Sequence, residues 1–139
     1  MTDFFNERVT IYNDIPGDGV NPRRFDRCVI NSCNIQSGST QTADGTIEKV
    51  VNAQTVITKD TKRYKNPMEY DQIPADLRSD FYTVRINDFV VFGEVDDVVT
   101  TAREFLDLQT KYANNGFSVT AVNAYIFGMS VDNIQIIHA

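Results

Sequence analysis

Four consecutive apolar residues, Phe89-Val90-Val91-Phe92, constrain the fold of this chain more than any other feature of its sequence. The run is short and is bounded by the turn formers Asn87-Asp88 and Gly93, which is typical of a strand buried on both faces. Immediately before it, residues 82–86 alternate apolar with polar side chains, the pattern of a strand with one buried face. The two runs together predict a β-rich fold with a central strand at residues 89–92.

The same kinds of pattern predict the rest of the sheet. Five more strands are expected, at residues 8–12, 25–35, 48–58, 117–126 and 133–138. The polar interruption Asn31-Ser32 predicts a bend or bulge in the second of these segments, and the short links predict antiparallel neighbours. A chain of 139 residues is long enough for one core. We therefore expect a single domain, residues 1–139, that is mainly β: a small antiparallel β-barrel or sandwich of about seven strands.

One short helix is expected, at about residues 101–112. Thr101 and Glu104 have the spacing of a capping box, in which each side chain bonds a free backbone N–H of the first helical turn. Phe105, Leu108 and Tyr112 then recur at helical spacing, which predicts one apolar face. We expect this face to pack over an open end of the barrel or sandwich.

Two segments lack a regular pattern. Residues 37–46 are small and polar, so we expect them to form the loop of a long hairpin. Residues 59–80 have no clean period and contain two prolines, which predicts a long irregular insert, and inserts of this length usually have a function. The apolar residues of the insert are expected to be exposed, as candidates for subunit contact: Tyr64, Met68, Tyr70, Ile73 and Leu77.

Residues that could carry chemistry are few. Cys28 and Cys33 are five positions apart on one predicted strand, so their side chains should point to opposite faces and not pair. His138 is the single histidine and lies next to the end of the chain, where a catalytic base would be poorly held. The sequence contains no nucleophile or phosphate-binding motif.

Two sets of acidic residues could supply oxygen ligands to a hard cation: Asp14 with Asp18, and Glu94 with Asp96 and Asp97. Neither has the regular spacing of a calcium loop, so solvated turns are the simpler interpretation. We therefore predict that the protein is not an enzyme and has no catalytic residue, no cofactor and no metal site.

The net charge of −6 argues against a surface that grips nucleic acid, since affinity for phosphate comes mainly from clustered Lys and Arg. It is compatible with DNA that passes close by without being held. Basic residues cluster only at residues 21–24 and 59–65, which we interpret as solvated or salt-bridged. No apolar stretch approaches the roughly 20 residues of a membrane span, and the first residues do not resemble a secretory signal. We expect no membrane partner, and a protein that acts where it is made.

Three segments of the C-terminal half resemble a known family: residues 87–97 (Asn-Asp-Phe-Val-Val-Phe-Gly-Glu-Val-Asp-Asp), 107–112 (Asp-Leu-Gln-Thr-Lys-Tyr) and 116–122 (Gly-Phe-Ser-Val-Thr-Ala-Val). Their order and spacing resemble small minor structural proteins of tailed bacteriophages, grouped with head-completion and head-tail connector proteins. The opening residues 8–13 also look like the first strand of that family. The resemblance covers roughly residues 82–125, and it implies a β-barrel subunit of a ring below the portal.

This resemblance implies a structural subunit of the head-closure or stopper type, located in the neck of the virion and made in the host cytoplasm. The expected partners are further copies in a hexameric or dodecameric ring, portal or adaptor proteins, tail proteins, and double-stranded DNA that passes through without sequence-specific binding. The polar segment would then line the channel, with these candidates: Ser37, Gly38, Thr40, Gln41, Asp44 and Gly45. The insert at residues 59–80 would clasp the next subunit.

Two alternatives stay open. A tail-terminator or tail-tube subunit would also form rings. A small β-barrel ligand-binding module or enzyme, with a pocket at the mouth of the sheet, belongs to another class and predicts a monomer or dimer.

Overall fold

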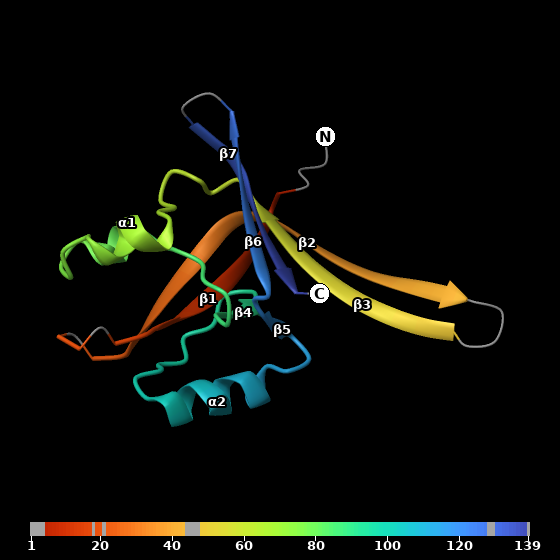
Figure 1. Cartoon of the computed structure of the whole chain (residues 1–139), viewed down its shortest axis with the longest axis horizontal. Helices are drawn as coiled ribbons and strands as arrows, with labels where there is room; N and C mark the ends of the chain where they lie inside the picture. The colour runs from red at the N-terminus through yellow and green to blue at the C-terminus, as the bar shows by residue number, and fades with distance from the viewer. Residues whose placement is uncertain (1–4, 18, 21, 44–47, 128–129, 139) are drawn as a thin grey trace.

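Seven antiparallel strands in one sheet dominate the computed structural model (Figure 1). It describes residues 5–17, 19–20, 22–43, 48–127 and 130–138, with only the backbone for residues 37–43, 48–53, 126–127 and 130–131. The strands are β1 (Glu7–Ile15), β2 (Arg24–Ala43), β3 (Glu48–Thr58), β4 (Phe89–Phe92), β5 (Gly116–Ser118), β6 (Ala121–Phe127) and β7 (Ser130–His138). Their order across the sheet is β5-β4-β1-β2-β3-β7-β6. The prediction of a mainly β fold of about seven antiparallel strands is confirmed.

The sheet is neither a two-layer sandwich nor a closed barrel. Strands β5 and β6 lie at opposite ends of the strand order, yet they follow each other in the chain. The two residues between them reach both ends of the sheet: the backbone N–H of Val119 donates to Asp88 O (2.8 Å), and that of Thr120 donates to Ile137 O (2.8 Å). The sheet therefore curls until its two edges approach each other, but it stays open.

Residues 82–86 correct the sequence prediction, because they do not form a strand of the sheet. Tyr82 makes a single bridge, parallel to Tyr64, with its N–H bonded to Arg63 O (3.0 Å). Val84 is buried as alternation requires, but Ile86, on the same predicted face, is 63% exposed. Residues 83–85 have no regular secondary structure, Ile86 begins the turn before β4, and the backbone bonds of Tyr82 go to the preceding insert instead of a strand of the sheet.

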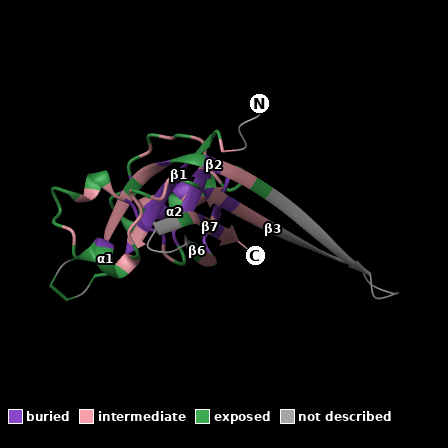
Figure 2. Cartoon of the chain, turned by 90° about the horizontal axis from the view of Figure 1, so that it is seen from above, coloured by how far each residue is buried: buried purple, intermediate pink, exposed green. Residues whose placement is uncertain are grey.

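Alternation along β1 and β4 divides the core into two clusters. Ile11 and Val90 belong to an inner cluster, which the curled sheet surrounds, whereas Tyr12 and Val91 belong to an outer cluster. The helix α2 (Ala102–Lys111) covers the outer cluster with Phe105 and Leu108. We expected this helix over an open end of the sheet, and that placement is wrong, because both faces of β4 are apolar and the outer one needs a cover. Figure 2 shows the buried residues at the centre of the body.

The start of α2 agrees with the capping-box prediction. Thr101 is the N-cap, and its hydroxyl oxygen accepts from the N–H of Glu104 (3.1 Å). The Glu104 carboxylate in turn accepts from the N–H of Thr100 (3.2 Å), one residue before the cap. Both free N–H groups are satisfied at the helix start.

A bulge in β2 corrects the prediction for the two cysteines. Glu7 lies opposite Cys33, but Val9 lies opposite Ile30, so β2 contains one extra residue between these pairs. Ser32 takes a positive φ of 54° at this point. The predicted bulge is thus confirmed, but the extra residue reverses the alternation after it. Cys33 and Cys28 consequently both contact the inner cluster instead of pointing to opposite faces.

The insert between β3 and β4 is partly ordered into short helices. It contains α1 (Pro67–Asp71) and a 3-10 turn, η1 (Arg78–Asp80). The N-cap of α1 is Asn66, whose side-chain oxygen accepts from the N–H of Glu69 (2.9 Å). Among the described residues, no helix is long and apolar enough to cross a membrane.

Candidate subunit interface

The predicted channel loop is mostly strand. Ser37, Gly38, Thr40 and Gln41 lie in β2, paired with β3 as far as Ala43 opposite Glu48. Asp44 and Gly45 lie outside the described residues. The hairpin was predicted correctly, but its loop was placed seven residues too early, because small polar side chains are typical of turns and yet do not prevent backbone pairing.

The distal part of this hairpin is paired only with itself. Towards the tip of the hairpin, the last residue of β2 that still pairs with β1 is Cys33. The last residue of β3 that still pairs with β7 is Gln54. We call residues 37–43 of β2 together with 48–53 of β3 the arm. Figure 1 shows the arm leaving the body of the sheet. Among the described strands, none flanks either of its outer edges.

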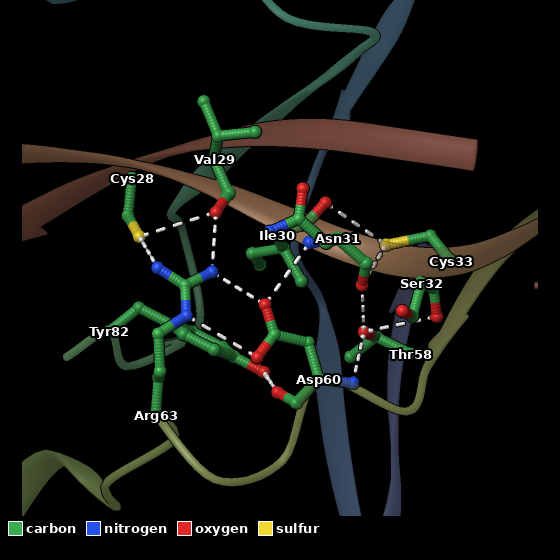
Figure 3. Close-up of polar contacts among 10 residues, drawn as sticks. All are labelled: Cys28, Val29, Ile30, Asn31, Ser32, Cys33, Thr58, Asp60, Arg63 and Tyr82. Carbon is green, nitrogen blue, oxygen red and sulfur yellow. Dashed lines mark hydrogen bonds and ion pairs between the residues drawn. The ribbon is translucent and has the colours of Figure 1, made fainter. Parts of the chain in front are cut away.

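The insert is attached to the sheet by a polar cluster around Arg63 (Figure 3). The Arg63 guanidinium bonds the Asp60 carboxylate and donates to Val29 O (2.8 Å). The Tyr82 hydroxyl donates to the backbone oxygen of Asp60. Asp60 also accepts from the N–H of Asn31 (3.2 Å), at the bulge of β2. The cluster therefore fixes the start and the end of the insert against β2.

The thiols beside this cluster are not activated. Burial raises the pKa of Cys33 to about 11. Burial also raises the pKa of Cys28, although Arg63, whose guanidinium lies 3.6 Å from the sulfur, acts in the opposite direction. Both thiols are therefore protonated at neutral pH, and the arrangement stabilises the fold but supplies no nucleophile.

A second attachment corrects the prediction for Tyr70. Its side chain is 3% exposed, and its hydroxyl donates to the Asp26 carboxylate (2.7 Å) on β2. Asp71 on the same helix binds the Arg85 guanidinium. Tyr70 is therefore a contact within the chain, because it is buried and binds a partner 44 residues away, and it is not available to another subunit.

The other subunit-contact candidates differ in exposure. Tyr64 is partly buried, with its ring centroid 5.7 Å from that of Tyr82. Ile73 is also half-buried. Met68 is 75% exposed and Leu77 is 49% exposed, so these two can contact a neighbour. The insert thus offers two exposed apolar side chains instead of five.

The sequence analysis missed a buried carboxylate, that of Asp88. Its side chain is fully buried and accepts three hydrogen bonds, from Asn13 Nδ2 (2.7 Å), the Asp14 N–H (2.9 Å) and the Arg85 N–H (2.7 Å). Burial outweighs these bonds and raises its pKa to about 6. The one sequence signal was its position in a predicted turn; in the structure the preceding residue of that turn, Asn87, has a positive φ of 79°. Asp88 ties this turn to the end of β1.

The acidic residues considered as cation ligands have separate partners. Glu94 pairs with Arg8 (3.3 Å), and Asp97 accepts from Lys111 (2.8 Å), which lowers the pKa of Asp97. Asp14 pairs with Arg23 (2.7 Å). Asp96 lies 3.4 Å from Arg27, and Asp18 lies outside the described residues. No group of His, Cys, Asp and Glu that could hold a metal ion occurs in the part of the chain that the structure describes.

His138 is held in the sheet, although we expected a frayed position. It pairs with Gln54 at the end of β7, and its Nδ1 lies 2.8 Å from Ser118 O on β5. Its ring also contacts Phe117, with centroids 6.0 Å apart. His138 therefore joins the two ends of the curled sheet.

Comparison with known proteins identifies a family but no function. No curated protein and no solved structure matches the chain. A family model does match residues 4–137, nearly the whole sequence. The chain belongs to this family, a family of unknown function designated DUF6751.

Proposed function

We propose that the protein is a structural subunit of the connector ring between the head and tail of a tailed bacteriophage, of the head-closure or stopper type. The ring would join a portal or adaptor to the tail and surround the DNA. The sequence resemblance at residues 82–125 is the reason for this class. The shape of the subunit in the structure supports a ring assembly by a separate argument.

The observation that carries the proposal is the arm. It extends past every other described strand, with both outer edges unpaired. A two-stranded ribbon is at best marginally stable in water by itself. An arm of this kind is therefore more readily explained in a subunit that uses it against a neighbour than in a protein that works alone.

Surface properties agree with the proposal. Met68 and Leu77 project from the insert with much of their side chains exposed, as expected where a second molecule covers them. The net charge of −6 suits the wall of a channel through which DNA moves, because an acidic wall does not retain a polyanion.

The decisive experiment is electron microscopy of the virion together with analysis of the purified protein. We expect rings by negative stain, a hexamer or dodecamer by light scattering, and density for this chain at the head-tail junction. We also expect no measurable retention of double-stranded DNA at physiological salt.

Other outcomes would assign the protein differently. Rings within the tail or at its end would favour a tail-tube or tail-terminator subunit. A monomer that is absent from virions would refute the structural role, and a ligand that raises its melting temperature would then favour a binding module.

A further inference from the structure

The sheet stays open along one seam, between residues 84–86 and β6. The N–H of Asn87 bonds Val119 O (2.8 Å), but beyond this point no backbone bond joins the two segments among the described residues. A cavity of about 390 Å³ lies in the seam. Its lining is mainly apolar, with Arg85 as its one charged residue, and the other lining residues come from the insert, from residues 84–86 and from β6: Tyr64, Pro67, Val84, Ile86, Val122 and Ala124.

Strand β6 presents an unpaired edge to this seam. It is the last strand in the sheet order, and β7 is its only partner among the described strands. Native edge strands usually carry lysines, other charges or prolines that prevent pairing with another chain. The seven residues of β6, Ala-Val-Asn-Ala-Tyr-Ile-Phe, include none of these. An extended segment that adds to β6 would satisfy the edge and cover the seam.

The arm of a second copy has the properties that a strand pairing with β6 needs. Its β2 edge, residues 37–43, has the same length as β6, is paired with no other strand that the structure describes, and contains no charged residue and no proline. The β3 edge begins with Glu48-Lys49, a charged pair of the kind that protects an edge. The arm leads away from the body that carries it, so it is placed to reach a neighbour (Figure 1).

We propose that the arm of one copy adds through its β2 edge to β6 of the next copy, along the seam. The inference rests on the ring assembly proposed above and identifies its interface. Each copy gives an arm on one side and receives an arm on the other, which is a heterologous contact of the kind that closes into rings. Ser37, Gly38, Thr40 and Gln41 are then subunit contacts and not channel lining.

Two variants test the two halves of the contact separately, the β6 edge and the arm. For the edge, Ala124→Lys places a charge in the seam at an exposed position; its control, Ala113→Lys, makes the same change at an exposed alanine after α2. For the arm, the short-arm variant replaces residues 38–53 by Asn-Gly, which joins the paired residues Ser37 and Gln54 through a hairpin turn. Circular dichroism and urea unfolding verify that each variant is folded.

We expect the Ala124→Lys and short-arm variants to be monomers by light scattering, and Ala113→Lys to assemble like the unchanged protein. An equimolar mixture of the two monomers should form a 1:1 dimer and nothing larger, because one variant retains the arm and the other retains the edge. Assembly of either variant alone, or a mixture that stays monomeric, would overturn the proposal. Assembly of the short-arm variant alone would indicate pairing of β6 with β6.

Hydrogen exchange of the unchanged protein gives a test that needs no variant. Residues 37–43 and 121–127 should gain protection together as the protein is concentrated, whereas an unchanged pattern would contradict the contact. The proposed function and the proposed contact can be refuted independently of each other. Rings built through this contact but absent from the head-tail junction would refute the function alone, and Ala124→Lys rings at that junction would refute the contact alone.

Discussion

Replacement of Asp88 should reveal how much the fold depends on one buried carboxylate. In Asp88→Ala, the donors from Asn13, Asp14 and Arg85 all lose their acceptor inside the protein. Each buried donor left without a partner costs about 1–3 kcal/mol. Removal of a buried charge offsets part of this cost. We therefore expect the free energy of unfolding to fall by about 3–5 kcal/mol, a large part of the 5–15 kcal/mol typical of a domain.

Asp88→Asn should destabilise the protein less than Asp88→Ala does, and it is the matched control. Asp88 Oδ1 accepts only from the Asp14 N–H, and the new amide oxygen can take that place. The new amide nitrogen would take the place of Oδ2 and face two donors, the Arg85 N–H and Asn13 Nδ2, which is held in its orientation by a bond to Thr83 O (2.8 Å). We expect a loss of about 2–3 kcal/mol, since the Asp14 bond is kept while the donors of Asn13 and Arg85 lose this acceptor.

The pH dependence tests the raised pKa of Asp88. Its pKa in the folded protein is about 6, above the ordinary value of 3.8 for an aspartate, so the native state binds the proton more strongly than the unfolded chain. Proton binding by Asp88 therefore stabilises the folded protein. This stabilisation is fully present below about pH 4 and is lost as the pH rises through 6. The difference in unfolding free energy between the unchanged protein and Asp88→Asn should therefore grow by up to about 3 kcal/mol from pH 7 to pH 4.

Urea unfolding followed by circular dichroism at several pH values measures both effects. The reasoning would be refuted if Asp88→Ala lost less than about 1 kcal/mol, the net value of a single ordinary hydrogen bond. A difference between the unchanged protein and Asp88→Asn that stays flat or shrinks towards pH 4 would show that the three hydrogen bonds outweigh burial.

Three further predictions concern other parts of the fold. Gly116→Ala should destabilise the protein by about 1–3 kcal/mol in urea unfolding, since the added methyl would overlap the backbone oxygen of Val90 and press on the Phe89 ring; an unchanged midpoint would contradict the close β4–β5 approach. Thr101→Ala should lose about 1 kcal/mol with the N-cap of α2, whereas Thr101→Ser should retain most of it. Cys28 and Cys33 should react with a thiol reagent far more slowly at pH 7 than after unfolding in urea, because burial raises both pKa values; equal rates would show that the thiols are accessible.

Local patterns predicted the parts of the fold that depend on local physics. The N-cap at Thr101 rests on bonds within three residues, and the strand at residues 89–92 is marked by its own apolar run between turn formers; the structure has both. The bulge near Ser32 also followed from polar residues that interrupt a strand. Its effect on Cys33 did not follow, because one extra residue changes the face of every residue beyond it.

The candidate interface was predicted less well, since it depends on distant partners. Alternation at residues 82–86 indicated a strand, but pairing also needs a neighbour, and Arg85 is bound to Asp71 of the insert. Tyr70 was expected to be exposed because the insert has no regular apolar pattern, and its partner Asp26 lies far away in sequence, on β2. The short polar side chains of residues 37–43 concealed a paired strand.

These long-range contacts explain why the seam exists. Arg63 and Tyr70 fasten the insert to β2, and the bonds of Arg85 to Asp71 and to Pro67 O (3.3 Å) hold residues 84–86 beside the insert. Among the described residues, no backbone bond joins residues 84–86 to β6, whose one partner strand is β7. In the assembly proposed above, the insert has a role that differs from the predicted clasp. It would hold residues 84–86 away from β6, and the arm of the next copy would pair with that edge.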